Sequence, residues 1–385
     1  MASIELNPTP PKTKALASPA VDFWMLGGGS IIITIILMPL LHFFGALSPY
    51  IIGVSLAAGS LVINYPHFGF SYLLFYDGFL DRLQSPLTTM ASKIRILTAG
   101  IAVPVSLILL LVISYQQKNA DLLIFMMLAS LALTGWHYSK QGYGVLITLS
   151  VYKKSFYSAR EKFILYMNAY SMWIFSWALL ANENYKKSGS LYGLELHILA
   201  VPKWIVLFLA FIASVSTGAA LVVFAKRFLA DRKNFPVNGM FAYIAGIYFW
   251  TVFLNRNAWG VLVFFAIIPV FHAVQYLFFV WKLKSREFSA TQMVQEAGAQ
   301  SVKKTKNRTF VSLMSFLLGG WFIGTFFIAL LPLVDRVHFA AWGGGISFFG
   351  IASQIFINTH HFFMDSAYWR KDNQVVQKYL FKAEG

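Results

Sequence analysis

The stretch AVPKWIVLFLAFIASVSTGAALVVFA, residues 200–225, decides the fold class. After Lys203 it continues to Ala225 without a single charged side chain. A transmembrane α-helix needs about 20 consecutive, mostly apolar residues to cross the hydrocarbon core of a bilayer. The stretch therefore predicts a transmembrane helix.

Nine further apolar runs of similar character predict the same structure elsewhere in the chain. The ten runs lie at approximately residues 22–46, 49–76, 94–116, 121–152, 162–182, 200–225, 237–255, 258–282, 310–334 and 338–369. Of all residues, 58% are hydrophobic and only 12% are charged, whereas soluble domains carry about 25% charged residues. The sequence predicts an all-α polytopic membrane helix bundle of about ten transmembrane helices.

The distribution of lysine and arginine predicts how this bundle is oriented. If the N-terminus is cytoplasmic, 24 of the 31 basic residues fall on the cytoplasmic side and 6 on the outer side, while Lys140 lies inside a helix. Cytoplasmic loops carry such an excess of positive charge in membrane proteins. We expect residues 1–21 and 370–385 to be cytoplasmic tails, 22–369 to be the transmembrane domain, and 284–309 to be a cytoplasmic loop.

Charge and cysteine content exclude several kinds of site and partner. The formal net charge of +16 is explained by membrane topology, so no nucleic-acid partner is expected. The chain has no cysteine, which excludes disulfides, thiolate metal sites and iron–sulfur clusters. The expected location is the lipid bilayer of a bacterial inner membrane, with multiple crossings.

Five of the eight histidines lie inside the apolar runs: His67, His137, His272, His360 and His361. Ionisable residues within transmembrane helices are costly, and they mark functional sites by default. All but His360 sit at the centre of a polar stripe, with polar residues three or four positions away on the same helix face. On the predicted topology the four stripes form a layer in the cytoplasmic half of the membrane, with His137 about two turns deeper unless its helix projects further.

Imidazoles that converge in an apolar layer predict a bound metal ion, and a haem iron is the alternative. We expect His67, His137, His272 and His361 to be ligands, with His360 as an alternative ligand. Imidazole and carboxylate without thiolate suit non-haem Fe(II), zinc or manganese, and we expect Fe(II), with zinc as the alternative. Polar bonding between helices, with no metal, would explain the same histidines less well.

Four further residues complete the predicted site. Asp365 is expected either to bind the metal or to orient the His361 ring by accepting its second N–H group. Gln141, Gln275 and Tyr72 are expected to contact substrate or to support the ligands. A site at this depth is reachable sideways by lipid-soluble molecules, which favours a metal-dependent oxygenase or oxidoreductase acting on a hydrophobic substrate. A haem-binding electron-transfer protein and a transporter with a proton or metal relay remain alternatives.

The histidine motifs also carry a resemblance. The segments PHFGFSY (66–72), WHYSKQGYG (136–144), FHAVQYLFFVW (271–281) and HHFFMDSAYWR (360–370) resemble those of a family of bacterial multi-histidine polytopic membrane proteins. The resemblance implies a multi-helix membrane fold and no particular activity. The design is similar, more loosely, to that of bacterial carotene-cleaving membrane oxygenases, which gather histidines from several helices around one iron.

Overall fold

The computed structural model describes residues 14–43, 58–182, 189–191, 193–196, 200–253, 268–296, 302–337 and 346–381. Within these ranges the regular structure is helical, apart from one antiparallel hairpin of β1 (Gly189–Leu191) and β2 (Leu194–Leu196). The prediction of an all-α fold is confirmed.

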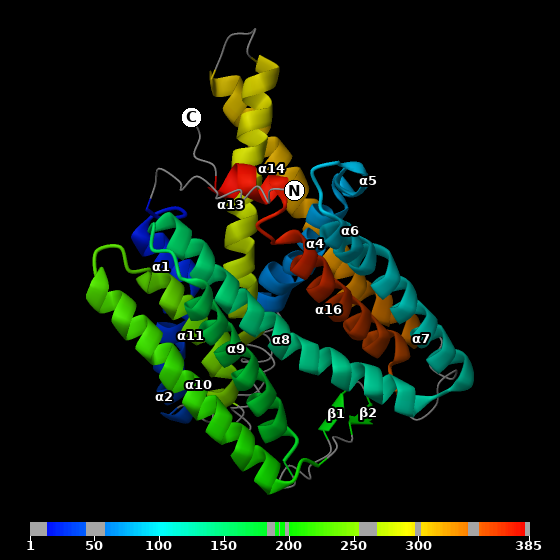
Figure 1. Cartoon of the computed structure of the whole chain (residues 1–385). Helices are drawn as coiled ribbons and strands as arrows, with labels where there is room; N and C mark the ends of the chain where they lie inside the picture. Colours follow the sequence, from blue (N-terminus) through cyan, green and yellow to red (C-terminus); the bar gives the residue numbers. More distant parts are fainter. Residues whose placement is uncertain are drawn as a thin grey trace.

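Figure 1 shows the helices of the described residues. They are α1 (Pro19–Leu26), α2 (Gly28–Phe43), α4 (Tyr65–Tyr76), α5 (Phe79–Gln84), α6 (Met90–Leu97), α7 (Val103–Gln117), α8 (Ala120–Tyr152), α9 (Ala159–Leu180), α10 (Lys203–Ala230), α11 (Val237–Phe253), α13 (Ile268–Glu296), α14 (Val302–Thr325), α15 (Val334–Val337), α16 (Phe348–Tyr368) and α17 (Gln374–Val376). Several are extended by the π-helical turns η1 (Ser60–Asn64), η2 (Thr98–Ala102), η5 (Phe326–Leu330) and η7 (Gln377–Phe381) and by the 3₁₀ turn η6 (Leu331–Leu333).

Five helical segments are long and apolar enough to cross a membrane: Met90–Gln117, Ala120–Tyr152, Ala159–Leu180, Lys203–Ala230 and Phe310–Leu333. A sixth results if α1 and the first part of α2 count as one span, bent by 57°. These segments indicate a multi-pass integral membrane protein. The described residues do not, however, contain the ten spans that the sequence predicts.

The difference has a physical reason in how the apolar runs fold. The described part of the run at 49–76 forms η1 and the 12-residue α4, and the run at 237–255 forms the 17-residue α11. The runs at 258–282 and 338–369 begin outside the described residues, and α13 and α16 carry many polar side chains. Hydropathy along a linear run does not detect where a helix bends or where a polar face interrupts it.

The segment 284–309, predicted as a cytoplasmic loop that could hold a short amphipathic helix, is helical over most of its described residues, and its cytoplasmic location stays a prediction. Helix α13 continues to Glu296 and α14 begins at Val302, and the two form a hairpin that projects beyond the other helices (Figure 1). The segment is rich in Lys, Arg, Glu, Gln and Ala, which are good helix formers. The change from apolar to polar sequence therefore indicates where the apolar part of the helices ends, and the helical structure continues beyond that point.

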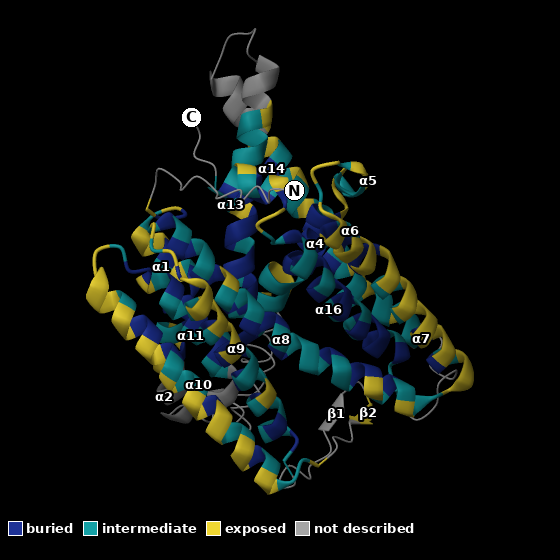
Figure 2. Cartoon of the chain, viewed as in Figure 1, coloured by how far each residue is buried: buried dark blue, intermediate teal, exposed yellow. Residues whose placement is uncertain are grey.

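Apolar side chains cover the outward faces of the long helices. On α10, Leu207, Phe208, Phe211 and Val215 are all exposed, whereas Ala213 and Ala220 on its other face are buried. Figure 2 shows the same division along α7 and α10, with exposed residues outward and buried residues facing the interior. Large exposed apolar faces mark contact with a membrane or a partner, and together with the candidate spans they indicate embedding in a bilayer.

Helix α8 takes part in all three hydrophobic cores of the described chain. Its first turns pack with α7 and α16 through Leu123 and Met127, and Leu146 packs with α9, α10 and α11. Its last turns pack with α4, α13 and the end of α16 through Leu149 and Tyr152. In Figure 1 this helix runs obliquely between the group of α9, α10 and α11 and the group of α4, α7 and α16.

The first and last described residues lie at one end of the bundle. The Lys14 ammonium group donates to Asn234 in the α10–α11 turn at 3.4 Å. The Tyr152 hydroxyl, at the C-terminal end of α8, donates to the carbonyl of Leu380 in η7. The beginning and end of the described chain therefore share this end with the α8–α9 and α10–α11 turns.

Glycines permit the closest helix contacts, and two pairs of helices depend on them. A Cβ atom at Gly69 of α4 would overlap the backbone carbonyl of Gly320 in α14, and one at Gly324 would overlap the carbonyl of Tyr65. Between α8 and α11, a Cβ at Gly142 would lie 3.1 Å from the carbonyl oxygen of Ala242. Small residues at such positions let helix backbones approach closely in membrane proteins.

We expect Gly69→Ala and Gly324→Ala to lower the free energy of unfolding by roughly 1–3 kcal/mol, as over-packing does elsewhere. Thermal unfolding of the purified protein in detergent would measure the loss. Gly144→Ala is the matched control, because a Cβ atom there would meet no atom within 4 Å. Equal melting temperatures for all three variants would show that the contact between α4 and α14 is looser than described.

Candidate metal centre

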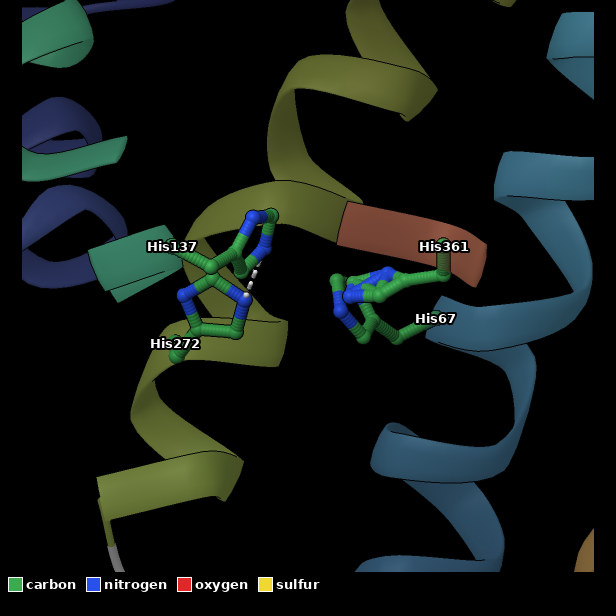
Figure 3. Close-up of side chains that lie close together, drawn as sticks. All are labelled: His67, His137, His272 and His361. Atoms are coloured by element: carbon green, nitrogen blue, oxygen red, sulfur yellow. Dashed lines mark hydrogen bonds between the residues drawn. The ribbon is translucent and has the colours of Figure 1, made fainter. Parts of the chain in front are cut away.

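Four histidines from four different helices meet in the interior of the bundle. His67 lies on α4, His137 on α8, His272 on α13 and His361 on α16. Each side chain offers one ring nitrogen to a set in which all four atoms lie within 4.8 Å of one another. Figure 3 shows the rings gathered between the helices, with His137 and His272 joined by a hydrogen bond. The predicted convergence of these histidines is confirmed.

The offset of two turns expected for His137 is not seen, because its ring nitrogen lies within 4.8 Å of those of the other three histidines. Counting residues from the next cytoplasmic charge assumed that all four helices are parallel and equally tilted. Helix α8 instead runs obliquely through the centre of the bundle (Figure 1), so His137 reaches the same place from farther along its helix.

The four imidazoles are removed from solvent. Their exposed fractions are 1% for His67, 5% for His137, 8% for His272 and 0% for His361. Adjacent rings meet edge to face, with centroids 4.6 Å apart for His67–His361 and 5.0 Å apart for His67–His272. Such close packing of buried polar rings requires partners for their nitrogens.

Several of those nitrogens have no partner. Among the described residues, neither ring nitrogen of His67 or His361 makes a hydrogen bond, and neither does Oδ2 of Asp365. A buried polar group left unpaired costs about 1–3 kcal/mol. A neutral imidazole presents one lone pair in the ring plane, which is the group that a metal ion binds.

The separations fit the dimensions of a single metal ion. Zinc binds imidazole nitrogen at about 2.0–2.1 Å in tetrahedral geometry, so its ligand atoms lie about 3.3–3.4 Å from one another. The Nε2 atoms of His137 and His272 are 3.1 Å apart, as adjacent ligands would be. The whole set lies within 4.8 Å, so the four nitrogens would have to move closer together to bind one ion.

The Asp365 carboxylate lies at the rim of the cluster. Its Oδ1 accepts hydrogen bonds from the hydroxyl groups of Ser71, at 2.9 Å, and Tyr276, at 3.2 Å. Its Oδ2 lies 3.8 Å from Nε2 of His137 and 3.8 Å from Nδ1 of His361. Both predicted roles, ligand and orienting group, are therefore within reach of small movements.

A buried carboxylate also needs a compensating positive charge. Among the described residues, no lysine or arginine lies within ion-pairing distance of Asp365, whereas two imidazole nitrogens lie 3.8 Å from its Oδ2. A divalent cation among those imidazoles would supply the charge and remove most of the cost of burying the carboxylate.

The two predicted glutamines bond to each other beside His272. The Gln141 amide donates to Oε1 of Gln275 at 2.7 Å and to the backbone carbonyl of His272 at 3.1 Å. The Gln275 amide donates to the carbonyl of Leu26, the last residue of α1. These bonds tie α8, α13 and α1 together around His272. Contact of either glutamine with substrate stays a prediction.

His360 and Tyr72 lie outside the cluster. His360 Nδ1 bonds to the Tyr72 hydroxyl at 3.0 Å, and its Nε2 lies 3.0 Å from the carbonyl oxygen of Ala99. Successive residues on a helix point in directions about 100° apart, so His360 faces η2 while His361 faces the centre. Since both ring nitrogens of His360 have partners, the structure does not bring it in as an alternative ligand.

Two aromatic residues that the sequence did not single out pack on the cluster histidines. Tyr138 stacks on the His272 ring with centroids 4.0 Å apart, and Phe362 stacks on His137 at 4.6 Å. Each follows a cluster histidine in the sequence yet packs on the ring of a different one. Aromatic residues are so frequent in this chain, at 17%, that no local signal distinguished these two.

Comparison with known proteins gives no further guide to this arrangement. No protein family, curated protein or solved structure matches the chain. The chemistry of the centre is therefore argued from its geometry.

The glutamine pair can be tested by a double-mutant cycle. We expect Gln141→Leu and Gln275→Leu each to destabilise the fold, because each leaves a buried amide group of the other without its partner, at a cost of about 1–3 kcal/mol. The double variant should lose less free energy of unfolding than the two single variants lose together, with a coupling free energy of about 0.5–3 kcal/mol. Denaturant unfolding of the wild type, the two single variants and the double variant measures this coupling free energy. Strictly additive losses would contradict the hydrogen bond between Gln141 and Gln275.

Proposed function

We propose that this protein is a metal-dependent membrane enzyme of the oxygenase or oxidoreductase type, acting on a lipid-soluble substrate. His67, His137, His272 and His361 are its metal ligands in this proposal. The observation that carries it is the meeting of four buried imidazoles, one from each of four helices, within 4.8 Å. The centre would bind the metal, and the surrounding helices would exclude water from it.

Polar bonding between helices explains the cluster less well than a metal does. Histidines that only hold helices together satisfy their nitrogens with neighbouring donors and acceptors. His360 does this, with partners for both ring nitrogens. His67 and His361 do not, since neither makes a hydrogen bond among the described residues.

The donor set favours iron over zinc for an enzyme. Four imidazoles would fill the tetrahedral shell of zinc, and closed zinc sites are structural, whereas catalytic ones keep a position open. An iron ion of higher coordination number would keep positions for Asp365 and for a reactant. Imidazole and carboxylate without thiolate are the ligands of non-haem Fe(II) oxygenases, and the chain has no cysteine.

Haem fits the arrangement less well than a single ion. A porphyrin would have to lie flat between two of the imidazoles. The four rings instead contact one another edge to face, with centroid separations of 4.6–5.0 Å. Separating them to admit a macrocycle would require the four helices to move apart.

Metal analysis of the detergent-purified protein is the direct test. We expect about one equivalent of iron, or of zinc, and no Soret band. His137→Ala, His272→Ala and His361→Ala should each lower metal affinity at least as much as the 10–100-fold loss typical of residues that only support a ligand. Asp365→Asn should cause a smaller loss, because Oδ2 lies 3.8 Å from the two nearest imidazoles.

His360→Gln is the matched control, since it changes a buried histidine that lies next to His361 but outside the cluster. It should retain metal at the wild-type stoichiometry. Full metal content in the three cluster variants would refute the metal centre. Metal-free wild-type protein would do the same and favour a proton relay, and a strong Soret band would favour haem.

The orientation that we propose places both termini in the cytoplasm of a bacterium. It is supported by the basic residues, 24 on the proposed inner side against 6 outside. It is also supported by the shared end of the bundle at which Lys14 and Leu380 lie.

A fluorescent protein that folds only in the cytoplasm should be fluorescent when fused after Gly385. Alkaline phosphatase inserted at Gly193, in the β1–β2 turn, should be active only if that turn reaches the periplasm, as we expect. Phosphatase activity at the C-terminal fusion site would reverse the proposed orientation.

A further inference from the structure

A cavity of about 400 Å³ lies against one side of the histidine cluster. Its walls come from α1, α2, η1, α8, α11 and α13, and include Trp24, Leu26, Ile33, Phe249, Phe271 and Val274. The volume falls in the range of about 300–1,000 Å³ that is usual for pockets that bind small molecules.

The cavity reaches a proposed metal ligand directly. His272 forms part of its wall, and so does Tyr138, whose ring stacks on the His272 imidazole with centroids 4.0 Å apart. Because the His272 Nε2 atom lies 3.1 Å from that of His137, one imidazole separates the cavity from the centre of the cluster. A molecule in the cavity would lie beside the metal.

The chemistry of the lining selects an uncharged, hydrocarbon-rich molecule. Among the described residues, those that line the cavity include no lysine, arginine, aspartate or glutamate. Its Gln275 amide already bonds to Gln141 and to Leu26, and the Ser30 hydroxyl already donates to the carbonyl of Gly27 at 2.7 Å. A charged group brought here would lose its hydration without gaining an opposite charge.

The cavity lies beside the apolar outer surface of the bundle. Two of its lining residues, Trp24 of α1 and Ile33 of α2, have exposed fractions of 53% and 45%. Both belong to the bent helix pair that is a candidate membrane span. An opening beside these side chains would face lipid rather than water.

We propose that this cavity binds a neutral, long-chain lipid that enters sideways from the bilayer past α1 and α2 and lies against His272. The inference rests on the proposed function, because it makes the cavity the substrate site of the metal centre. It narrows the substrate class from any lipid-soluble molecule to one without a charged group at the reacting end.

Photolabelling of the full-length protein, as purified in detergent, tests the proposal. The probe is an uncharged sixteen-carbon alcohol with a diazirine on its chain, and the labelled residues are mapped by peptide mass spectrometry. We expect label on cavity residues of α1, α2 and α13. A carboxylate probe of equal length should label these residues at least about tenfold less.

Two variants that narrow the cavity provide the decisive comparison. Val274→Trp fills the cavity from α13. Ile33→Trp blocks the exposed side of the cavity, where the fold accommodates the larger tryptophan ring more easily. Each should reduce cavity labelling at least about tenfold. Val215→Trp is the matched control, because Val215 lies on the outward face of α10 with an exposed fraction of 58%. It should leave labelling unchanged.

Metal content measured on the same samples separates the two proposals. Wild-type protein that holds metal but shows no cavity label would overturn this inference and leave the metal centre standing. Cavity label without bound metal would refute the proposed function instead. Equal labelling by the neutral and charged probes, or labelling insensitive to both Val274→Trp and Ile33→Trp, would also overturn the inference.

Discussion

The passage of helix α8 through the middle of the bundle is the constraint on which the rest of the arrangement depends. This helix of 33 residues is the element shared by all three hydrophobic cores. Its oblique course brings His137 among the histidines of α4, α13 and α16. Close contact with α11 at Gly142 holds that course, because a side chain there would meet the backbone of Ala242.

The cluster concentrates polar groups in a chain that otherwise buries apolar ones. Each unpaired buried group costs about 1–3 kcal/mol, so the imidazoles and Asp365 oppose folding when nothing binds them. An ion that binds only the native arrangement stabilises it by mass action, by about 4 kcal/mol at a thousand times its Kd. Stability and metal binding are therefore expected to be coupled in this protein.

The two sides of the cluster differ in chemistry. Beside Asp365, the hydroxyl groups of Ser71 and Tyr276 form a hydrogen-bonded network. Beside His272, the cavity is lined mainly by apolar side chains. A polar side that holds the ligands and an apolar side that admits a hydrocarbon chain would let one centre bind both a metal ion and a lipid. His360 and Tyr72 extend the polar side toward η2 without joining the cluster.

The sequence by itself determined the helical membrane fold class and the four histidines that meet. Both follow from local patterns, since an apolar run favours a membrane helix and a polar stripe at helical spacing defines a face. The structure alone decided that the first apolar run is bent, because the bend at Gly27 depends on a φ of 154° and on close contact with Ala242. Only the structure showed that His361 joins the cluster while His360 does not, and only the structure showed the cavity. Both the directions of the rings and the spaces between helices depend on the packing of residues that are far apart in the chain.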